Sequence, residues 1–253
     1  MPLLSDLIDL PDYPLISLVG AGGKTTTMYT LARELAQKGK RVITTTTTQI
    51  FTPTADETEE LIIEAEISLL LNKVQVAWNH HRHITVAASV NERGKLMSLH
   101  PDIVLQLIQI GGADAVIIEA DGARHRQIKA PAHYEPVIPT ETNVALLLMS
   151  AEAINQPLSE AIAHRPERIA AVTGIDIGGM LTPDVIARLM TSENGALKDI
   201  PENAKTYLLV THATRDRGES VLELAGLVRK SQCISGVLYS EMAGMWFTLA
   251  RQP

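Results

Sequence analysis

The sequence predicts an α/β protein of the P-loop NTPase type, with a mostly parallel sheet covered by helices on both faces. Two observations lead to this class. Short apolar runs of strand length alternate along the chain with segments of helical periodicity. A turn rich in glycine, followed by a lysine and threonines, occupies residues 20–26 between the first apolar run and the first helical segment. We expect one domain over residues 1–253, with a small edge hairpin inserted at residues 73–95.

The first strand–helix–strand unit begins at residue 15. An apolar run at 15–19 predicts a buried strand, and Met28, Leu31 and Leu35 recur at helical spacing within 25–38. Residues 41–45 are rich in β-branched side chains and predict the next strand, parallel to the first.

The segment after this unit predicts a helix over 56–71 and two strands at 74–78 and 84–88, joined by a turn rich in histidine. The later elements follow the same alternation. Strands are expected at 115–119, 144–148, 206–210 and 234–238, and helices at 101–110, 182–190 and 220–229.

The composition narrows the function classes. With 22 Lys and Arg against 29 Asp and Glu, the formal net charge is −7, which disfavours binding to nucleic acid or to anionic membranes. The single cysteine excludes an intramolecular disulfide and a four-cysteine zinc site. The first residues are acidic rather than basic, and no apolar run approaches the ~20 residues of a membrane span, so we expect a cytoplasmic protein.

The loop at residues 20–26 has the composition of a phosphate-binding loop. Glycines allow backbone N–H groups to turn toward phosphates, and a helix N-terminus favours anions. Lys24 is expected to reach the β and γ phosphates, and Thr25 to ligate Mg²⁺. The loop lacks the first glycine of the usual pattern, since Leu18 stands there, and its short form is closer to the loop of Mur-type ligases than to that of small GTPases. The expected nucleotide-binding residues are Gly20, Ala21, Gly22, Gly23, Lys24, Thr25 and Thr26.

Two acidic residues lie at the end of the strand predicted at 115–119 and just beyond it. Glu119 and Asp121 are two positions apart, so both face the same side if the strand continues that far. A carboxylate at such a strand end is the usual second Mg²⁺ ligand of a phosphate loop. The alternative is that one acid only caps a turn. We take both as catalytic and metal-binding candidates without ranking them.

Further polar residues gather near the expected strand ends. Thr45 and Thr46 lie in a run of five threonines whose hydroxyls could contact phosphate or substrate. The alternative is that the run reflects only the β-propensity of threonine in an edge strand. Arg124 follows Asp121 and suits a γ-phosphate transition state. Basic or polar residues that could contact an anionic substrate are Lys129, His164 and Arg165; a solvated basic loop is the alternative.

These motifs together resemble the YqeC family. The resemblance rests on Gly-Ala-Gly-Gly-Lys-Thr-Thr at 20–26, the threonine run after Val42, Glu-Ala-Asp-Gly-Ala at 119–123, Lys-Ala-Pro at 129–131 and Glu-Pro-Val-Ile-Pro at 135–139. Segments at 164–167, 181–183 and 194–198 also look like that family. Its members are described as accessory proteins of selenium-dependent molybdenum hydroxylases, assigned to selenium cofactor biosynthesis.

The resemblance implies a step that depends on a nucleotide and Mg²⁺ during maturation of such a hydroxylase or its cofactor. It implies a molybdenum hydroxylase or a molybdopterin-type ligand as partner, and an NTP hydrolase or nucleotide-dependent transferase as activity. Thr-His-Ala-Thr at 211–214 departs from the guanine-reading Asn-Lys-x-Asp pattern, so ATP and GTP both stay open. The alternatives are an ATP-dependent ligase or kinase that activates a small acid, and a nucleotide-sensing scaffold without turnover.

Overall fold

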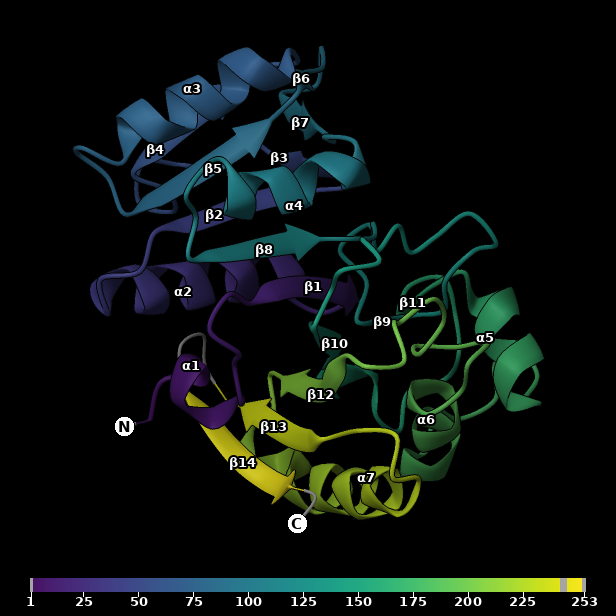
Figure 1. Cartoon of the computed structure of the whole chain (residues 1–253). Helices are drawn as coiled ribbons and strands as arrows, with labels where there is room; N and C mark the ends of the chain where they lie inside the picture. The colour runs from purple at the N-terminus through teal and green to yellow at the C-terminus, as the bar shows by residue number, and fades with distance from the viewer. Residues whose placement is uncertain (1, 242–244, 252–253) are drawn as a thin grey trace.

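The centre of the fold is a twisted sheet of nine strands, in a computed structural model that describes residues 2–241 and 245–251. Within those residues the strand order is β14-β13-β12-β10-β1-β8-β2-β5-β4, and Figure 1 shows the sheet from its β4 edge to its β14 edge. All neighbours from β13 to β4 pair in parallel, and only β14 runs antiparallel. The expected mostly parallel sheet is therefore confirmed. The strands are β1 (Leu15–Gly20), β2 (Val42–Thr46), β4 (Glu60–Ile63), β5 (His83–Ala87), β8 (Ala115–Glu119), β10 (Val144–Ser150), β12 (Lys205–Thr211), β13 (Gly236–Ser240) and β14 (Trp246–Arg251).

Helices cover both faces of this sheet, as expected. They are α1 (Leu4–Leu7), α2 (Lys24–Gln37), α3 (Ile67–Ala77), α4 (Pro101–Gln109), α5 (Pro166–Thr173), α6 (Pro183–Met190) and α7 (Gly218–Lys230). The first two pack on one face, in a cluster that includes Leu18 and Leu148. On the opposite face, α3 and α4 cover β2, β5 and β8, while α6 and α7 cover β10 and β12.

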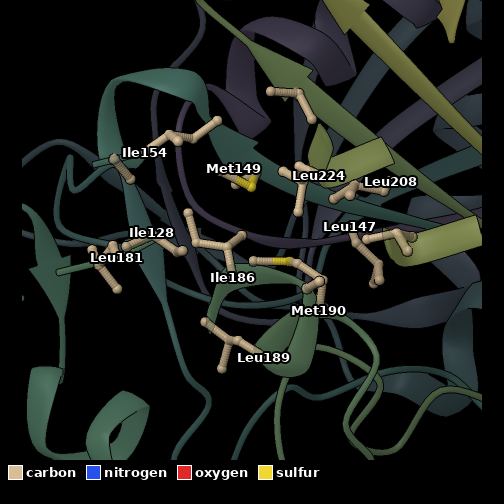
Figure 2. Packing of buried hydrophobic residues seen from close by; sticks show 14 of the residues in the cluster. Ile128, Leu147, Met149, Ile154, Leu181, Ile186, Leu189, Met190, Leu208 and Leu224 are labelled. Carbon is tan, nitrogen blue, oxygen red and sulfur yellow. The ribbon is translucent and has the colours of Figure 1, made fainter. Parts of the chain in front are cut away.

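The core on the α6 and α7 side follows from the alternation of side chains along a strand. Leu147 and Met149 of β10 point toward Ile186 and Met190 of α6, and Figure 2 shows these apolar side chains gathered together with Leu208 of β12. The residues between them on β10 face α2 instead. Because both faces of β10 are buried, the strand is apolar at nearly every position.

Residues 56–78 differ from the expectation. The expected helix does not span 56–71: residues 60–63 make the edge strand β4, and a helix, α3, begins only at Ile67. The Glu66 carboxylate accepts hydrogen bonds from the N–H groups of Ser68 and Leu69, and so fixes the start of that helix. The strand expected at 74–78 is instead the end of α3 and its cap, where Leu70 and Val74 face the core.

The edge hairpin expected at 73–95 is consequently not formed by these segments. Residues 83–87 form β5, which lies within the large sheet between β2 and β4. A small antiparallel sheet does occur nearby, built from β3 (Gln49–Phe51), β7 (Lys95–Met97) and β6 (Ser89–Val90). A further two-stranded parallel pair joins β9 (Ile128–Lys129) to β11 (Ala163–His164).

The parallel pairing brings several strand ends to one edge of the sheet. In register, Gly20 of β1 pairs with Leu148 of β10, and Glu119 of β8 lies between Leu18 and Thr46. The next strand along, β12, ends at Thr211 opposite Ser150. The loop at 20–26 therefore meets the ends of β8, β10 and β12. In the described residues, no helix is long and apolar enough to cross a membrane.

Candidate functional site

The loop between β1 and α2 adopts a backbone that only glycine accommodates easily. Gly20, Gly22 and Gly23 have φ angles of 101°, 78° and 111°, all in the left-handed region. A Cβ atom on Gly20 would lie 2.2 Å from the Leu148 carbonyl oxygen, and one on Gly22 would lie 2.5 Å from the Ser150 nitrogen. The loop therefore lies directly against the end of β10, and this close approach requires glycine.

Several N–H groups of the loop are bound within the protein. The N–H of Ala21 donates to the Leu148 carbonyl at 2.9 Å, and that of Gly22 donates to the Arg126 carbonyl at 3.1 Å. The first N–H groups of α2 differ, because those of a helix's first turn have no acceptor inside the helix. The N–H groups that open α2, beginning at Lys24, thus mark the positive end of the helix dipole, where an anion is favoured.

Lys24 is buried, with 4% of its side chain exposed, although it opens a helix at a loop. Its Nζ donates to the Gly20 carbonyl at 2.6 Å and lies 3.1 Å from Oδ1 of Asp121 and 3.8 Å from Oε1 of Glu119. Burial lowers the pKa of Lys24, but the two carboxylates more than offset this, so its pKa lies above the ordinary value. The lysine is therefore charged and held toward the centre of the loop.

Thr25 and Glu119 form the second part of the site. The Thr25 hydroxyl donates to Oε2 of Glu119 at 2.7 Å. Burial raises the pKa of Glu119, and the nearby Lys24 counteracts only part of that rise. A hydroxyl and a carboxylate side by side are oxygen ligands of the kind Mg²⁺ prefers, with water and phosphate oxygens filling its other positions. Among the described residues, no group of three or more His, Cys, Asp or Glu could hold a metal ion.

Asp121 is hydrogen-bonded to the backbone at the start of the loop. Its carboxylate accepts the N–H of Gly20, at 3.2 Å to Oδ1 and 3.0 Å to Oδ2. It also lies between the ammonium groups of Lys24 at 3.1 Å and Lys129 at 3.0 Å, and only 2% of its side chain is exposed. Both carboxylate oxygens of Asp121 therefore have partners within the protein, whereas Glu119 lies beside the Thr25 hydroxyl.

A row of paired charges continues away from the loop. Lys129 donates to the Gly122 carbonyl at 2.6 Å and to Oε1 of Glu135 at 2.9 Å. Glu135 also accepts a hydrogen bond from Arg165, whose guanidinium lies 5.6 Å from the ring centre of Tyr134. Lys129 is buried and fully paired, so it has no free donor face toward the loop.

The remaining candidates from the sequence divide by exposure. Arg124 is exposed, with a φ of 48°, on the segment that follows Asp121. His164 is partly buried on β11, and burial together with Arg165 and Lys129 lowers its pKa to about 4. Thr45 and Thr46 are buried, and their hydroxyls donate to the Val86 and Glu119 carbonyls at 2.9 and 2.8 Å. Their hydroxyls serve the strand backbone, so we do not retain these two as substrate contacts.

Two residues at the site were not among the candidate site residues, although the sequence analysis noted their segment, 211–214, for its departure from the guanine-reading pattern. The hydroxyl of Thr211, at the end of β12, donates to the Gly22 carbonyl at 2.6 Å. His212 follows it with a φ of 51°, and its Nδ1 lies 3.3 Å from the Ser150 hydroxyl. Their place at the end of β12 was a further indication, and the order of strands in the sheet brings them to the loop.

Comparison with known proteins places this site in a family. The model of the YqeC protein family matches residues 16–167, more than half of the chain. The chain belongs to the YqeC family. A relative, the uncharacterized protein YqeC of Escherichia coli strain K12, is 27% identical over 233 residues, which cover 90% of this chain and 80% of that protein.

Solved structures with a similar overall arrangement have low sequence identity. FtsY from Mycoplasma mycoides has a TM-score of 0.44 and 13% identity, and the match covers 95% of this chain and 65% of that one. FtsY from Thermotoga maritima has a TM-score of 0.42 and 16% identity, covering 94% and 66%. FlhF complexed with GMPPNP and Mg²⁺ has a TM-score of 0.44 and 14% identity, covering 96% and 72%. This chain thus spans about two thirds of the length of the two FtsY chains.

The matched range of the YqeC family contains most of the site. Lys24, Glu119, Asp121, Lys129 and Glu135 all lie within residues 16–167. Thr211 and His212 lie beyond it, on the half of the sheet formed by β12 and β13. The family match therefore covers the phosphate loop and its charged neighbours but does not reach Thr211 and His212.

Proposed function

We propose that the protein binds a nucleoside triphosphate with Mg²⁺ at the loop of residues 20–26. The observation that carries this proposal is the set of groups around the start of α2: a buried charged Lys24, the Thr25 hydroxyl paired with Glu119, and the open N–H groups of the first helical turn. Anionic phosphates are favoured at such a helix start, and Thr25 and Glu119 would hold the metal. Bound Mg²⁺ would supply charge neutralisation for the phosphate oxygens.

The roles of the two acids separate in this proposal. Glu119 lies beside Thr25 and is the Mg²⁺ ligand, whereas Asp121 keeps the loop in shape through the N–H of Gly20. Arg124, exposed on the adjacent segment, is the candidate for contact with the outermost phosphate. His164 and Arg165 lie farther along the row of charges and are candidates for contact with an anionic partner or substrate.

Within this nucleotide-binding role, we place the protein in the maturation of a selenium-dependent molybdenum hydroxylase or its cofactor. The support for this narrower assignment is the resemblance of the motifs at 119–123 and 129–131, together with membership in the YqeC family. An NTP hydrolase or nucleotide-dependent transferase that acts on a partner or pterin ligand fits this role. An acceptor-activating ligase is the competing activity, and it would turn nucleotide over only when a small acid is present.

Calorimetric titration with ATP and GTP, each with Mg²⁺ and with EDTA, tests the binding step. We expect binding in Mg²⁺ that is lost in Lys24→Ala and weakened in Thr25→Ala, because the first removes the buried cation and the second a metal ligand. Lys40→Ala, an exposed lysine after α2, is the matched control and keeps wild-type affinity. Thermal melting of each variant checks folding. Unchanged affinity in Lys24→Ala would overturn the proposal.

A further inference from the structure

A cavity adjoins the phosphate loop on the side of β12 and β13. It has a volume of about 70 Å³ and opens to solvent. Its lining includes Gly23 and Thr26 at the start of α2, Thr211 and His212 after β12, Glu241 after β13, and Trp246 of β14. A nucleotide with its phosphates at the helix start would extend its remaining groups from there, and this cavity is the hollow adjoining that point.

His212 and Trp246 contribute ring side chains to the lining of the cavity. Nδ1 of His212 lies 3.1 Å from the Thr211 hydroxyl and 3.3 Å from the Ser150 hydroxyl, which orients its ring beside the loop. Trp246 is 3% exposed, and its indole N–H has no hydrogen-bond partner among the described residues. An imidazole and an indole lining one cavity suit a planar aromatic ring.

The polar edge of this cavity is a carboxylate. Glu241 is exposed at the rim, and no hydrogen-bond or ion-pair partner of its side chain occurs among the described residues. An ionised carboxylate accepts hydrogen bonds and donates none. It therefore pairs with a ring edge that presents two adjacent donors and repels a ring edge that presents an acceptor.

We infer that this cavity binds the base of the nucleotide and selects guanine through Glu241; the inference rests on the nucleotide-binding function proposed above. Guanine presents an N1–H and an N2 amino group side by side, which match the two carboxylate oxygens. Adenine presents one amino donor next to an unprotonated N1, which faces the carboxylate unfavourably. Hypoxanthine keeps the N1–H and lacks the amino group. Specificity then comes both from the pairing with guanine and from the mismatch with adenine.

The test compares four ligands by calorimetry in Mg²⁺: GTP, ITP, ATP and inorganic tripolyphosphate. We expect GTP to bind about tenfold or more tighter than ATP, with ITP in between, since a hydrogen bond to a charged group contributes about one factor of ten or more. In Glu241→Gln the ratio of GTP to ATP affinity should fall toward one. Glu202→Gln, an exposed acid at the opposite edge of the sheet before β12, is the matched control and keeps the ratio.

The outcomes separate the two proposals. Equal affinities for GTP and ATP, both tighter than tripolyphosphate, would overturn the selection of guanine. Tripolyphosphate binding as tightly as either nucleotide would overturn the base pocket and leave the phosphate site intact. Absence of binding by all four ligands to the folded protein would overturn both. An unchanged preference in Glu241→Gln would show that another group reads the base and would refute the role given to Glu241.

Discussion

Replacing Asp121 by asparagine removes a negative charge that lies between two buried ammonium groups. The carboxylate is 3.1 Å from Nζ of Lys24 and 3.0 Å from Nζ of Lys129, and it also accepts the N–H of Gly20. Breaking a buried pair while leaving the partner charge in place costs about 3–5 kcal/mol. Each lysine retains a second carboxylate, Glu119 at 3.8 Å or Glu135 at 2.9 Å, so we expect the lower end, about 3 kcal/mol.

Urea unfolding followed by circular dichroism at pH 7 measures this loss. Asp121→Asn should shift the midpoint to lower urea without a change in slope, because the same surface is exposed on unfolding. Asp12→Asn is the matched control, since Asp12 is exposed and its variant should stay within about 0.5 kcal/mol of wild type. A loss below about 1 kcal/mol for Asp121→Asn would refute the reasoning that this charge holds the two lysines in place.

Three further outcomes are expected. Gly22→Ala should reduce unfolding free energy by about 1–3 kcal/mol and abolish nucleotide binding in calorimetry, because its Cβ would lie 2.5 Å from the Ser150 nitrogen; Gly39→Ala, with a similar φ and no atom within 4 Å, should lose less. Burial raises the pKa of Glu119, so its ionised form destabilises the folded protein above that pKa; Glu119→Gln should be at least as stable as wild type at pH 7, with the difference shrinking as pH falls toward 4.5, and a less stable variant at pH 7 in urea unfolding would contradict this. Burial lowers the pKa of His83 to about 4, so its contribution to stability is present above pH 6.5 and is lost as pH falls toward 4; NMR titration should find this imidazole neutral at pH 6, and protonation there would disprove the assignment.

The sequence was most informative where a local pattern decides the structure. The strand, glycine turn and helix at 15–37 were predicted almost to the residue, because the turn requires glycine and the helix has a clear apolar spacing. The prediction for residues 56–78 was wrong, because the positions of Leu61 and Ile62 fit the spacing of a helix as well as that of a strand. Pairing at the edge of the large sheet makes residues 60–63 a strand, and the cap formed by Glu66 starts the helix after it. Neither effect can be seen in the periodicity of the sequence.

The candidate site also has a part that the local sequence predicts and a part that only the fold brings together. Lys24 and Thr25 followed from the motif, and Glu119 from its place at the end of a strand. Their burial did not follow, and Lys24 is not the surface-loop residue that its position suggests. Thr211 lies 189 residues from Gly22, so only the order of strands in the sheet makes it a neighbour of the loop. The run of threonines has a packing explanation, since Thr44 bonds within the core to His83 and Thr85.

The row of charges behind the loop has a consequence for how an anion can be held there. Its cations are Lys24, Lys129 and Arg165, and its anions are Glu119, Asp121 and Glu135, so the formal charges cancel. A polyphosphate that arrives at α2 therefore meets no net positive charge from this row. The compensating charge then comes with the ligand as Mg²⁺, from the helix dipole, and from basic side chains outside the row such as Arg124 on the segment after Asp121. In the nucleotide-binding role proposed above, such a site takes up the metal and the phosphates together as one neutralised unit.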